Sequence, residues 1–483
     1  MIARLSVALV LLTSAAVLVL EILVVRLVAP YVGLTLETYT AAIGVALAAI
    51  AAGAAAGGRL ADRVDPRLWL GAATALGGVL VLVARPVVLL LGEAFRGTGP
   101  AGSLVLVAAA VGPAAAVLSA VPPGVVKLRL RTLAETGETV GRLSAVGTLG
   151  ALAGTFLTGF VLLTALPTSR LLLVVGGVLV VLGTALAVTR RRVLGVAALA
   201  AVAALLGVDS SCDVETRYYC AAVVDDPERA GGRTLVLDGL RHSYVDLDDP
   251  AHLEFAYTRR IGDVLAAQPD GPLDVLHLGL GGGSVPRHLA QVRPGSRSVV
   301  LEVDPRLVEL GRERLDLRTG PDLQVVVGDA RTSIADQPDG AYDVVVGDAF
   351  GSLAVPWHLT TAEMAAEVRR VLRPGGTYVV NVIDNPPLDF ARAFTATLRD
   401  AFAEVAVLAP AASLAGDGGG NLVVVASDAG LPVEELARRA TRRGEAGAAG
   451  PQQAARFAGD AQVLTDDDAP VDQLLTPYRT GSG

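Results

Sequence analysis

A glycine cluster after a short apolar run is the first feature of this chain whose residue types suit ligand binding. The run Val275–Leu278 is followed by four glycines, Gly279, Gly281, Gly282 and Gly283. Glycine lets the backbone approach a nucleoside or phosphate because it lacks a Cβ, and the helix-compatible VPRHLAQV that follows would point N–H groups at the ligand. Glu302 ends another apolar run about 20 residues later, where a nucleotide-binding βαβ unit places its ribose-binding acid. The pattern predicts a nucleoside site; a plain turn in an α/β domain is the alternative.

Two further carboxylates lie at the ends of apolar runs. Asp329 follows LQVVV and Asp348 follows YDVVVG. Apolar strands that alternate with helical segments are buried on both faces, so they predict a parallel sheet covered by helices. Glu302, Asp329 and Asp348 would then line the crevice at the carboxyl edge of the sheet, where such folds bind ligands. Each of them could instead cap a helix.

Other segments outline the rest of this domain. Residues Arg233–Pro250 predict a β-hairpin with its turn at Gly239, and Pro305–Leu315 and Pro432–Arg443 predict helices. The acidic stretch Leu464–Leu475 either closes over the site or is a solvated turn. We expect a membrane bundle over residues 1–208, a linker with the hairpin over 209–265, the nucleoside-binding domain over 266–430, and a C-terminal helix and acidic tail over 431–483.

The N-terminal part reads as a membrane domain. Residues 1–207 carry 15 of the 40 basic and 7 of the 48 acidic residues, which leaves the remainder with a net charge of about −16. An acidic domain disfavours nucleic acid as a partner. Spans of about 20 apolar residues cross a bilayer. Seven runs approach that length, the last only marginally: Leu5–Leu27, Tyr39–Ala56, Leu68–Ala84, Ser103–Ala120, Leu143–Leu163, Leu171–Val188 and Val193–Val208.

The loop charges predict the orientation of this bundle. Eleven basic residues lie on the side of the N-terminus and four on the other, so the N-terminus is expected in the cytoplasm. If Val193–Val208 spans, the distal domain is extracytoplasmic; if that run lies in the interface, the domain is cytoplasmic. Cys212 and Cys220, the only cysteines, are close enough to form a disulfide in an oxidising compartment, with two unpaired thiols as the alternative. The pair favours an extracytoplasmic domain, and two cysteines without further ligands do not suggest a metal site.

Two polar features of the membrane part are candidates for a function. Glu21 lies mid-span, where an ionisable group is usually functional, or it pairs with Arg26. The segment GGRLADR, Gly57–Arg63, resembles the loop signature of major facilitator transporters. The helix count is roughly half that of such a transporter, so we expect an anchor rather than a transporter.

Residues from about Leu235 to Val382 resemble the spermidine synthases, the polyamine aminopropyltransferases, whose catalytic domain has the fold of S-adenosylmethionine-dependent methyltransferases. The whole chain resembles bacterial spermidine-synthase-like proteins fused to a membrane bundle. The similar stretches are LDG at Leu237–Gly239, EFAY at Glu254–Tyr257, the glycine cluster, LEVD at Leu301–Asp304, GDA at Gly328–Ala330 and YDVVVGDA at Tyr342–Ala349.

This resemblance implies roles for individual residues. Gly279, Gly281 and Gly283 would form the cofactor loop, Glu302 would bind the ribose, and Asp329 with the Ala330 amide would contact the adenine. Asp348 matches the family's catalytic base, which takes a proton from the acceptor ammonium before it attacks decarboxylated S-adenosylmethionine. Tyr257 matches a tyrosine that positions the amine. His242 takes the place of a cofactor-contacting glutamine or is an exposed hairpin residue, and His358 is either a substrate contact or a packing residue.

The chain departs from the family at three positions. The family's loop usually reads GGGDGG, and its aspartate, which helps hold a cationic group, corresponds to Gly282. A second aspartate, which binds the far ammonium of putrescine, corresponds to Gly351. Thr258 replaces the glutamine or histidine that often follows the tyrosine. A buried dication without these anions would be partly unpaired, so putrescine is a doubtful acceptor.

Three functions remain open from the sequence. The first is a membrane-anchored aminopropyltransferase-like enzyme that uses decarboxylated S-adenosylmethionine or S-adenosylmethionine, an amine acceptor and no metal. The second is a methyltransferase with the same nucleoside site. The third is a catalytically idle binding or sensing domain on a transporter-like bundle, which an extracytoplasmic site favours because these nucleosides are made in the cytoplasm. The expected partners are the lipid bilayer and a small molecule, with a homodimer as one candidate assembly.

Overall fold

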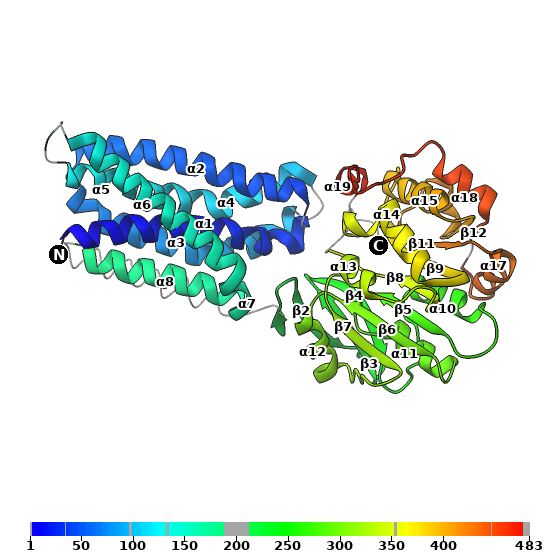
Figure 1. Cartoon of the computed structure of the whole chain (residues 1–483). Coiled ribbons are helices and arrows are strands. Elements are labelled where there is room, and N and C mark those ends of the chain that lie inside the picture. Colours follow the sequence, from blue (N-terminus) through cyan, green and yellow to red (C-terminus); the bar gives the residue numbers. More distant parts are fainter. Residues whose placement is uncertain are drawn as a thin grey trace. The chain divides into compact units, whose positions relative to one another are not determined.

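A computed structural model of the chain describes residues 2–33, 35–95, 99–130, 132, 135–187, 212–351, 355–445 and 447–476. The chain divides into two compact units, one built on residues up to Ser211 and the other on Cys212–Tyr478. Figure 1 shows the first unit as a bundle of helices and the second as sheets covered by helices.

The first unit is entirely helical where it is described. It comprises α1 (Ile2–Val32), α2 (Leu36–Arg63), α3 (Pro66–Phe95), α4 (Gly99–Ser119), α5 (Val121–Arg129), α6 (Thr136–Leu157), the π-helical turn η2 (Thr158–Leu162), α7 (Leu163–Ala165) and α8 (Thr168–Leu186). Among the described residues, six helical stretches are long and apolar enough to cross a membrane. These stretches coincide with the first six predicted spans, and the seventh run, Val193–Val208, lies outside the described residues.

The GGRLADR segment is the C-terminal end of α2, and its residues have packing roles. A Cβ on Gly57 would lie 2.3 Å from the Ala120 carbonyl oxygen, so only glycine allows the helices to approach so closely. Asp62 accepts a hydrogen bond of 2.7 Å from the Lys127 ammonium of α5. Helix packing and one exposed ion pair therefore account for these two residues of the segment.

The second unit begins with a four-stranded antiparallel sheet in the order β1-β2-β3-β4. Its strands are β1 (Val214–Glu215), β2 (Cys220–Asp225), β3 (Gly232–Leu237) and β4 (Leu240–Asp246). The predicted hairpin is confirmed, since β3 and β4 join at Asp238 and Gly239, both with positive φ, as a tight hairpin turn requires. A disulfide joins Cys212 to Cys220 at the start of this sheet, with the two Cα atoms 5.4 Å apart.

The larger sheet has eight strands in the order β12-β10-β11-β9-β8-β5-β6-β7. They are β5 (Asp274–Leu278), β6 (Arg297–Glu302), β7 (Leu323–Val327), β8 (Tyr342–Gly347), β9 (Leu372–Asp384), β10 (Glu404–Leu408), β11 (Gly420–Ser427) and β12 (Ala448–Ala449). The helices are α10 (Ala256–Ala266), α11 (Ser284–Val292), α12 (Pro305–Arg314), α13 (Ala330–Ser333), α14 (Ala362–Val371), α15 (Asp389–Ala401), α16 (Ala411–Ala415), α17 (Val433–Arg442), α18 (Pro451–Ala458) and α19 (Val471–Leu474), with 3₁₀ turns η3 (Ile334–Asp336) and η4 (Trp357–Leu359).

The predicted parallel sheet is confirmed for β5 to β9 and is wrong for the strands beyond β9. Strands β5 to β9 pair in parallel, but β11 pairs antiparallel with β9 and β10, and β10 with β12. The connection from β10 to β11 holds only the five-residue helix α16. A parallel neighbour needs a crossover of a dozen or more residues, usually with a full helix, so β11 returns antiparallel. The fold class itself, a Rossmann-type α/β domain behind apolar helices, is confirmed.

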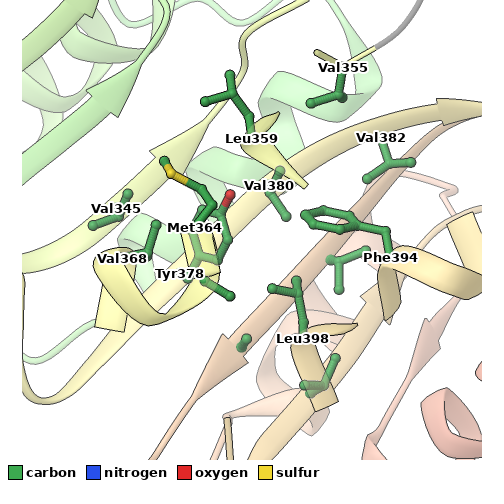
Figure 2. Packing of buried hydrophobic residues seen from close by; sticks show 14 of the residues in the cluster. Val345, Val355, Leu359, Met364, Val368, Tyr378, Val380, Val382, Phe394 and Leu398 are labelled. Carbon is green, nitrogen blue, oxygen red and sulfur yellow. The ribbon is translucent and has the colours of Figure 1, made fainter. Parts of the chain in front are cut away.

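The core beneath the carboxyl ends of β8 and β9 is apolar and closely packed. Figure 2 shows Met364 of α14 and Phe394 of α15 beside the strand residues Tyr378 and Val380. All four side chains are at most 3% exposed. Burial of such side chains contributes about 1.5–3 kcal/mol each, so the strand ends above them are held rigidly.

Candidate active site at the carboxyl edge of the sheet

The glycine cluster forms a turn that brings the backbone against Asp348. Gly279 has φ +95°, and a Cβ there would lie 2.6 Å from the Asp348 carbonyl oxygen. Gly281 and Gly283 also have positive φ, and Gly283 is the residue before α11. An L-residue is strained in this region, so glycines are needed to connect β5 to α11 so tightly. The predicted cofactor loop and the predicted base are thus in direct contact.

Glu302 connects the end of β6 to the glycine turn. Its carboxylate accepts hydrogen bonds from the Leu280 amide at 2.8 Å and the Asp304 amide at 2.9 Å. The side chain is 5% exposed, and burial raises its pKa while the two amides lower it. Each carboxylate oxygen has a further lone pair, so Glu302 still has the capacity to accept a hydrogen bond from a ligand hydroxyl.

Asp348 follows β8 and lies between two side-chain donors. The Asn381 amide donates to its Oδ1 at 2.9 Å, and the Tyr257 hydroxyl donates to its Oδ2 at 3.3 Å. Burial raises the pKa of Asp348 to about 6, against the opposing effect of these two hydrogen bonds. A carboxylate with such a pKa is mostly ionised at pH 7 and is still basic enough to take up a proton, as a general base requires.

Tyr257, near the start of α10, connects the two sheets at this point. Its hydroxyl lies 3.3 Å from both the Asp348 carboxylate and the backbone carbonyl of His242 in β4. Burial and the neighbouring Asp348 charge raise the pKa of Tyr257 well above its usual value, so it remains a hydrogen-bond donor. The imidazole of His242 is half-buried, with its ring centroid 6.4 Å from that of Tyr219.

Asp329, Ala330 and His358 form a second group, on the rim. Asp329 caps α13, and its Oδ1 accepts a hydrogen bond from the Arg331 amide at 2.8 Å. The predicted alternative of a helix cap is therefore correct for this oxygen. The other oxygen, Oδ2, lies 3.3 Å from His358 Nε2. Ala330 begins α13 and is buried. His358 therefore contacts the carboxylate that the adenine would be expected to approach.

The C-terminal acidic stretch is anchored to the same rim. Asp466 accepts hydrogen bonds from Arg331 at 2.5 Å and from the Thr361 hydroxyl at 2.7 Å. Its backbone amide donates to Glu363. Asp466 thus ties the stretch to α13 and the start of α14, while Asp466, Asp467 and Asp468 stay exposed to solvent.

Three residues at the site were not among the sequence predictions. Asn381 lies in β9 and Asn421 in β11, and the hydroxyl of Tyr219 donates to the Phe350 carbonyl beside Asp348 at 2.6 Å. The sequence did contain a signal for Asn381, because this residue places an amide inside the apolar run TYVVNVI. Buried amides need partners, so such a residue indicates a polar contact, but the partner cannot be read from the strand alone.

Comparisons with known proteins agree with this geometry. Residues 275–376 match the family of methyltransferase domains. A polyamine aminopropyltransferase of Vibrio vulnificus is 32% identical over 170 residues, which are 34% of this chain and 56% of that protein. One from Mycobacterium tuberculosis is 33% identical over 280 residues, 52% of this chain and 53% of that protein. The chain spans about half the length of these curated relatives.

The crystal structure of a probable spermidine synthase from Corynebacterium glutamicum has 28% sequence identity and a TM-score of 0.50, and the match covers 56% of this chain and 98% of that one. Over its second half, this chain is therefore similar to polyamine aminopropyltransferases and to methyltransferase domains. The resemblance seen in the sequence is confirmed, and the roles that it implies for single residues remain predictions.

Gly282 of the glycine turn lies close to two residues of the hairpin. A Cβ there would lie 2.9 Å from Ser243 Oγ and 3.3 Å from Val245 Cγ1, both on β4. Ser243 is 5% exposed. The space beside Gly282 is therefore occupied by the hairpin strand β4.

Proposed function

We propose that this protein transfers an aminopropyl group from decarboxylated S-adenosylmethionine to an amine, with Asp348 as the general base. The observation that carries the proposal is the position of Asp348. Its carboxylate lies between the Tyr257 hydroxyl and the Asn381 amide, and its backbone carbonyl packs against Gly279 of the glycine turn. Homology to aminopropyltransferases supports the same reaction type.

The chemistry assigned to Asp348 is proton removal. An ammonium has no lone pair, so Asp348 takes one proton from it before the amine nitrogen attacks the methylene carbon next to the sulfonium. The new C–N bond forms as the C–S bond breaks, and the sulfur leaves as a neutral thioether. With a pKa of about 6, roughly nine-tenths of Asp348 is ionised at pH 7 and ready to accept the proton.

The residues around the glycine turn suit a nucleoside. Residues 281 to 283 of the turn are glycines, so no side chain blocks the approach of a ligand. The Glu302 carboxylate accepts a hydrogen bond from the Leu280 amide of the turn. The negative charge of Asp348 would lie near the sulfonium of the donor. Asp329 has one oxygen committed to the α13 cap and one in contact with His358. Adenine contact would therefore require sharing or displacing the His358 contact.

We propose a singly charged amine, rather than putrescine, as the acceptor. The sequence resemblance implies that Gly282 and Gly351 take the places of two aspartates of the aminopropyltransferases, so a second ammonium would lack its anions. An uncompensated charge at a partly buried site costs several kcal/mol. Butylamine, which is putrescine without its second ammonium, is the matched probe.

The test uses the full chain in lipid nanodiscs. Calorimetric titration with methylthioadenosine, S-adenosylmethionine and its decarboxylated form measures the nucleoside site, and no binding of any of them would refute the proposal. Turnover with decarboxylated donor then compares butylamine with putrescine. A preference for putrescine would contradict the proposed acceptor and leave the reaction type standing.

Methyl transfer is the second candidate, because residues 275–376 match methyltransferase domains. It predicts S-adenosylhomocysteine as the product from S-adenosylmethionine, and the same nanodisc sample tests it. Binding of a nucleoside with neither product would instead favour a binding or sensing domain.

We also propose that the N-terminus is cytoplasmic and the second unit extracytoplasmic, so that the proposed transfer requires a donor that has crossed the membrane from the cytoplasm. The Cys212–Cys220 disulfide supports an oxidising compartment, and the basic residues of the loops support a cytoplasmic N-terminus. A fluorescent protein that matures only in the cytoplasm, fused after Gly483, should stay dark, and a bright fusion would overturn this orientation.

A further inference from the structure

Two asparagines on neighbouring strands connect Asp348 to the interior of the sheet. Asn381 in β9 is 2% exposed and lies between valines at 380 and 382. Its Nδ2 donates to Asp348 Oδ1 at 2.9 Å, and its Oδ1 accepts from Asn421 Nδ2 at 3.0 Å. Since β9 and β11 pair antiparallel with Asn421 opposite Ile383, the two amides are diagonal neighbours on one face.

The hydrogen bonds of Asn381 and Asn421 can run in only one direction. An ionised carboxylate only accepts hydrogen bonds, so Asn381 must present its NH₂ group to Asp348 and its carbonyl oxygen to Asn421. Asn421 must in turn present its NH₂ group to Asn381. Every donor therefore points toward Asp348, and the arrangement favours the charged carboxylate over the neutral acid.

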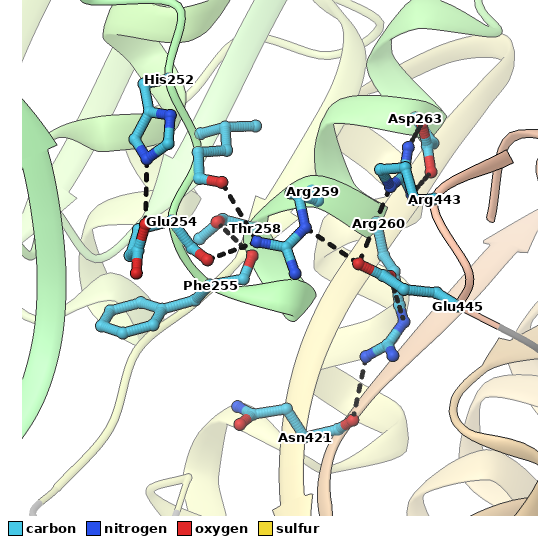
Figure 3. Close-up of polar contacts among 11 residues, drawn as sticks. His252, Glu254, Phe255, Thr258, Arg259, Arg260, Asp263, Asn421, Arg443 and Glu445 are labelled. Carbon is cyan, nitrogen blue, oxygen red and sulfur yellow. Dashed lines mark hydrogen bonds and ion pairs between the residues drawn. The ribbon is translucent and has the colours of Figure 1, made fainter.

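The backbone of Asn421 is held from the side of α10. Its carbonyl accepts from Arg260 Nη1 at 3.4 Å, and Arg260 is an ion-pair neighbour of Glu445, which also pairs with Arg259 (Figure 3). Arg260 lies one helical turn after Tyr257, the other donor to Asp348. One helix therefore supports both sides of the carboxylate.

We propose that Asn381 and Asn421 are positioning residues that keep Asp348 Oδ1 occupied and leave Oδ2, beside the Tyr257 hydroxyl, as the oxygen that takes up the proton. A proton on Oδ1 would face the N–H group of Asn381. A proton on Oδ2 would face the Tyr257 hydroxyl oxygen, because that hydroxyl can turn its own hydrogen to the His242 carbonyl at 3.3 Å. This inference rests on the proposed role of Asp348 as the base. It adds Asn421 to the residues that determine the behaviour of Asp348, through the hydrogen bond of Asn421 to Asn381.

The test measures the acid limb of the pH profile of kcat/KM for the full chain in nanodiscs. Asn421→Leu removes the donor that orients Asn381, and Asn421→Asp replaces it with an acceptor that would turn the Asn381 NH₂ group away from Asp348. We expect the acid limb to move up by about one to two pH units for Asn421→Asp, and by less for Asn421→Leu. Asn421→Ser, which keeps a donor, should restore most of the profile.

Ser427→Ala is the matched control, because Ser427 is a buried polar residue on the same strand and bonds to the Gly376 carbonyl instead. It should leave the acid limb in place. Affinity for methylthioadenosine should be unchanged in all four variants. If both Asn421→Asp and Asn421→Leu keep the parent acid limb, the pair is structural only and the inference is refuted.

A second readout separates this inference from the proposed reaction. The pH dependence of thermal unfolding reports the titration of Asp348 without turnover. Asn421→Leu, which adds no titratable group, should change that dependence in the parent chain and leave it unchanged in an Asp348→Asn background. The same change in both backgrounds would refute the proposal that the two asparagines position Asp348. If the unfolding data are as expected but no turnover is found, only the proposed reaction is refuted.

Discussion

The substitution Asp348→Asn tests the proposed base, because it should lower the rate of transfer and raise the stability of the folded chain at pH 8. In Asp348→Asn, the amide can keep both neighbours: its oxygen accepts from Asn381, and its NH₂ group donates to the Tyr257 hydroxyl, which can still donate to the His242 carbonyl. The variant should fold and bind nucleoside normally. Transfer should fall by about 10²- to 10⁴-fold, the usual contribution of a general base.

The effect on stability follows from the raised pKa of Asp348. Its value is about 6 in the folded chain and 3.8 in the unfolded chain, so between these pH values the unfolded chain ionises first. Stability of the parent chain is therefore lost as the pH rises through this window. The full difference of about 2.2 pH units corresponds to about 3 kcal/mol, and partial exposure of the carboxylate reduces it to about 1–3 kcal/mol.

Asparagine has no such cost, so Asp348→Asn should be more stable than the parent at pH 8 and equal to it below pH 4. The expected gain in Tm at pH 8 is about 3–10 °C for a unit of this size. Intrinsic fluorescence is a suitable assay, because Trp357 lies in the second unit and Trp69 in the first. A Trp69→Phe background makes the signal specific to the second unit.

Two results would refute this reasoning. Equal destabilisation by Asp348→Asn at pH 4 and pH 8 would show that the carboxylate is a structural hydrogen-bond partner without a raised pKa. Retained transfer with normal nucleoside affinity would show that another group acts as the base.

Three further predictions concern separate parts of the site. Transfer by the parent chain should fall about tenfold between pH 7 and pH 5, because Asp348 becomes protonated; a pH-independent rate over this range would contradict the assignment. Gly282→Asp should lower the free energy of unfolding by about 1–3 kcal/mol through its close contact with Ser243, and Ser243→Ala should recover part of that loss; additive effects in this double-mutant cycle would disprove the contact. The double change Cys212→Ser with Cys220→Ser should cost about 2–3 kcal/mol, the value for so short a loop; an unchanged Tm in the oxidised samples would argue against the disulfide.

The sequence by itself determined the parts of this protein that depend on local pattern. Long apolar runs predicted six helices that the structure contains, and glycines followed by a helical segment predicted the turn after β5. The Asp-Gly pair predicted the hairpin of β3 and β4. These features follow from hydrophobic periodicity and backbone conformation, which residues close in sequence decide.

Only the tertiary structure decided what surrounds Asp348. Tyr257 is 91 residues away from it in the chain, and Asn381 and Asn421 are 33 and 40 residues from their respective partners. The two asparagines meet because β11 returns antiparallel beside β9, an arrangement that the alternation of strands and helices did not predict. The contact of Gly282 with Ser243 likewise depends on how the hairpin packs against the turn. Strand order and sheet packing are long-range properties, so the residues that orient the base could not be read from any local pattern.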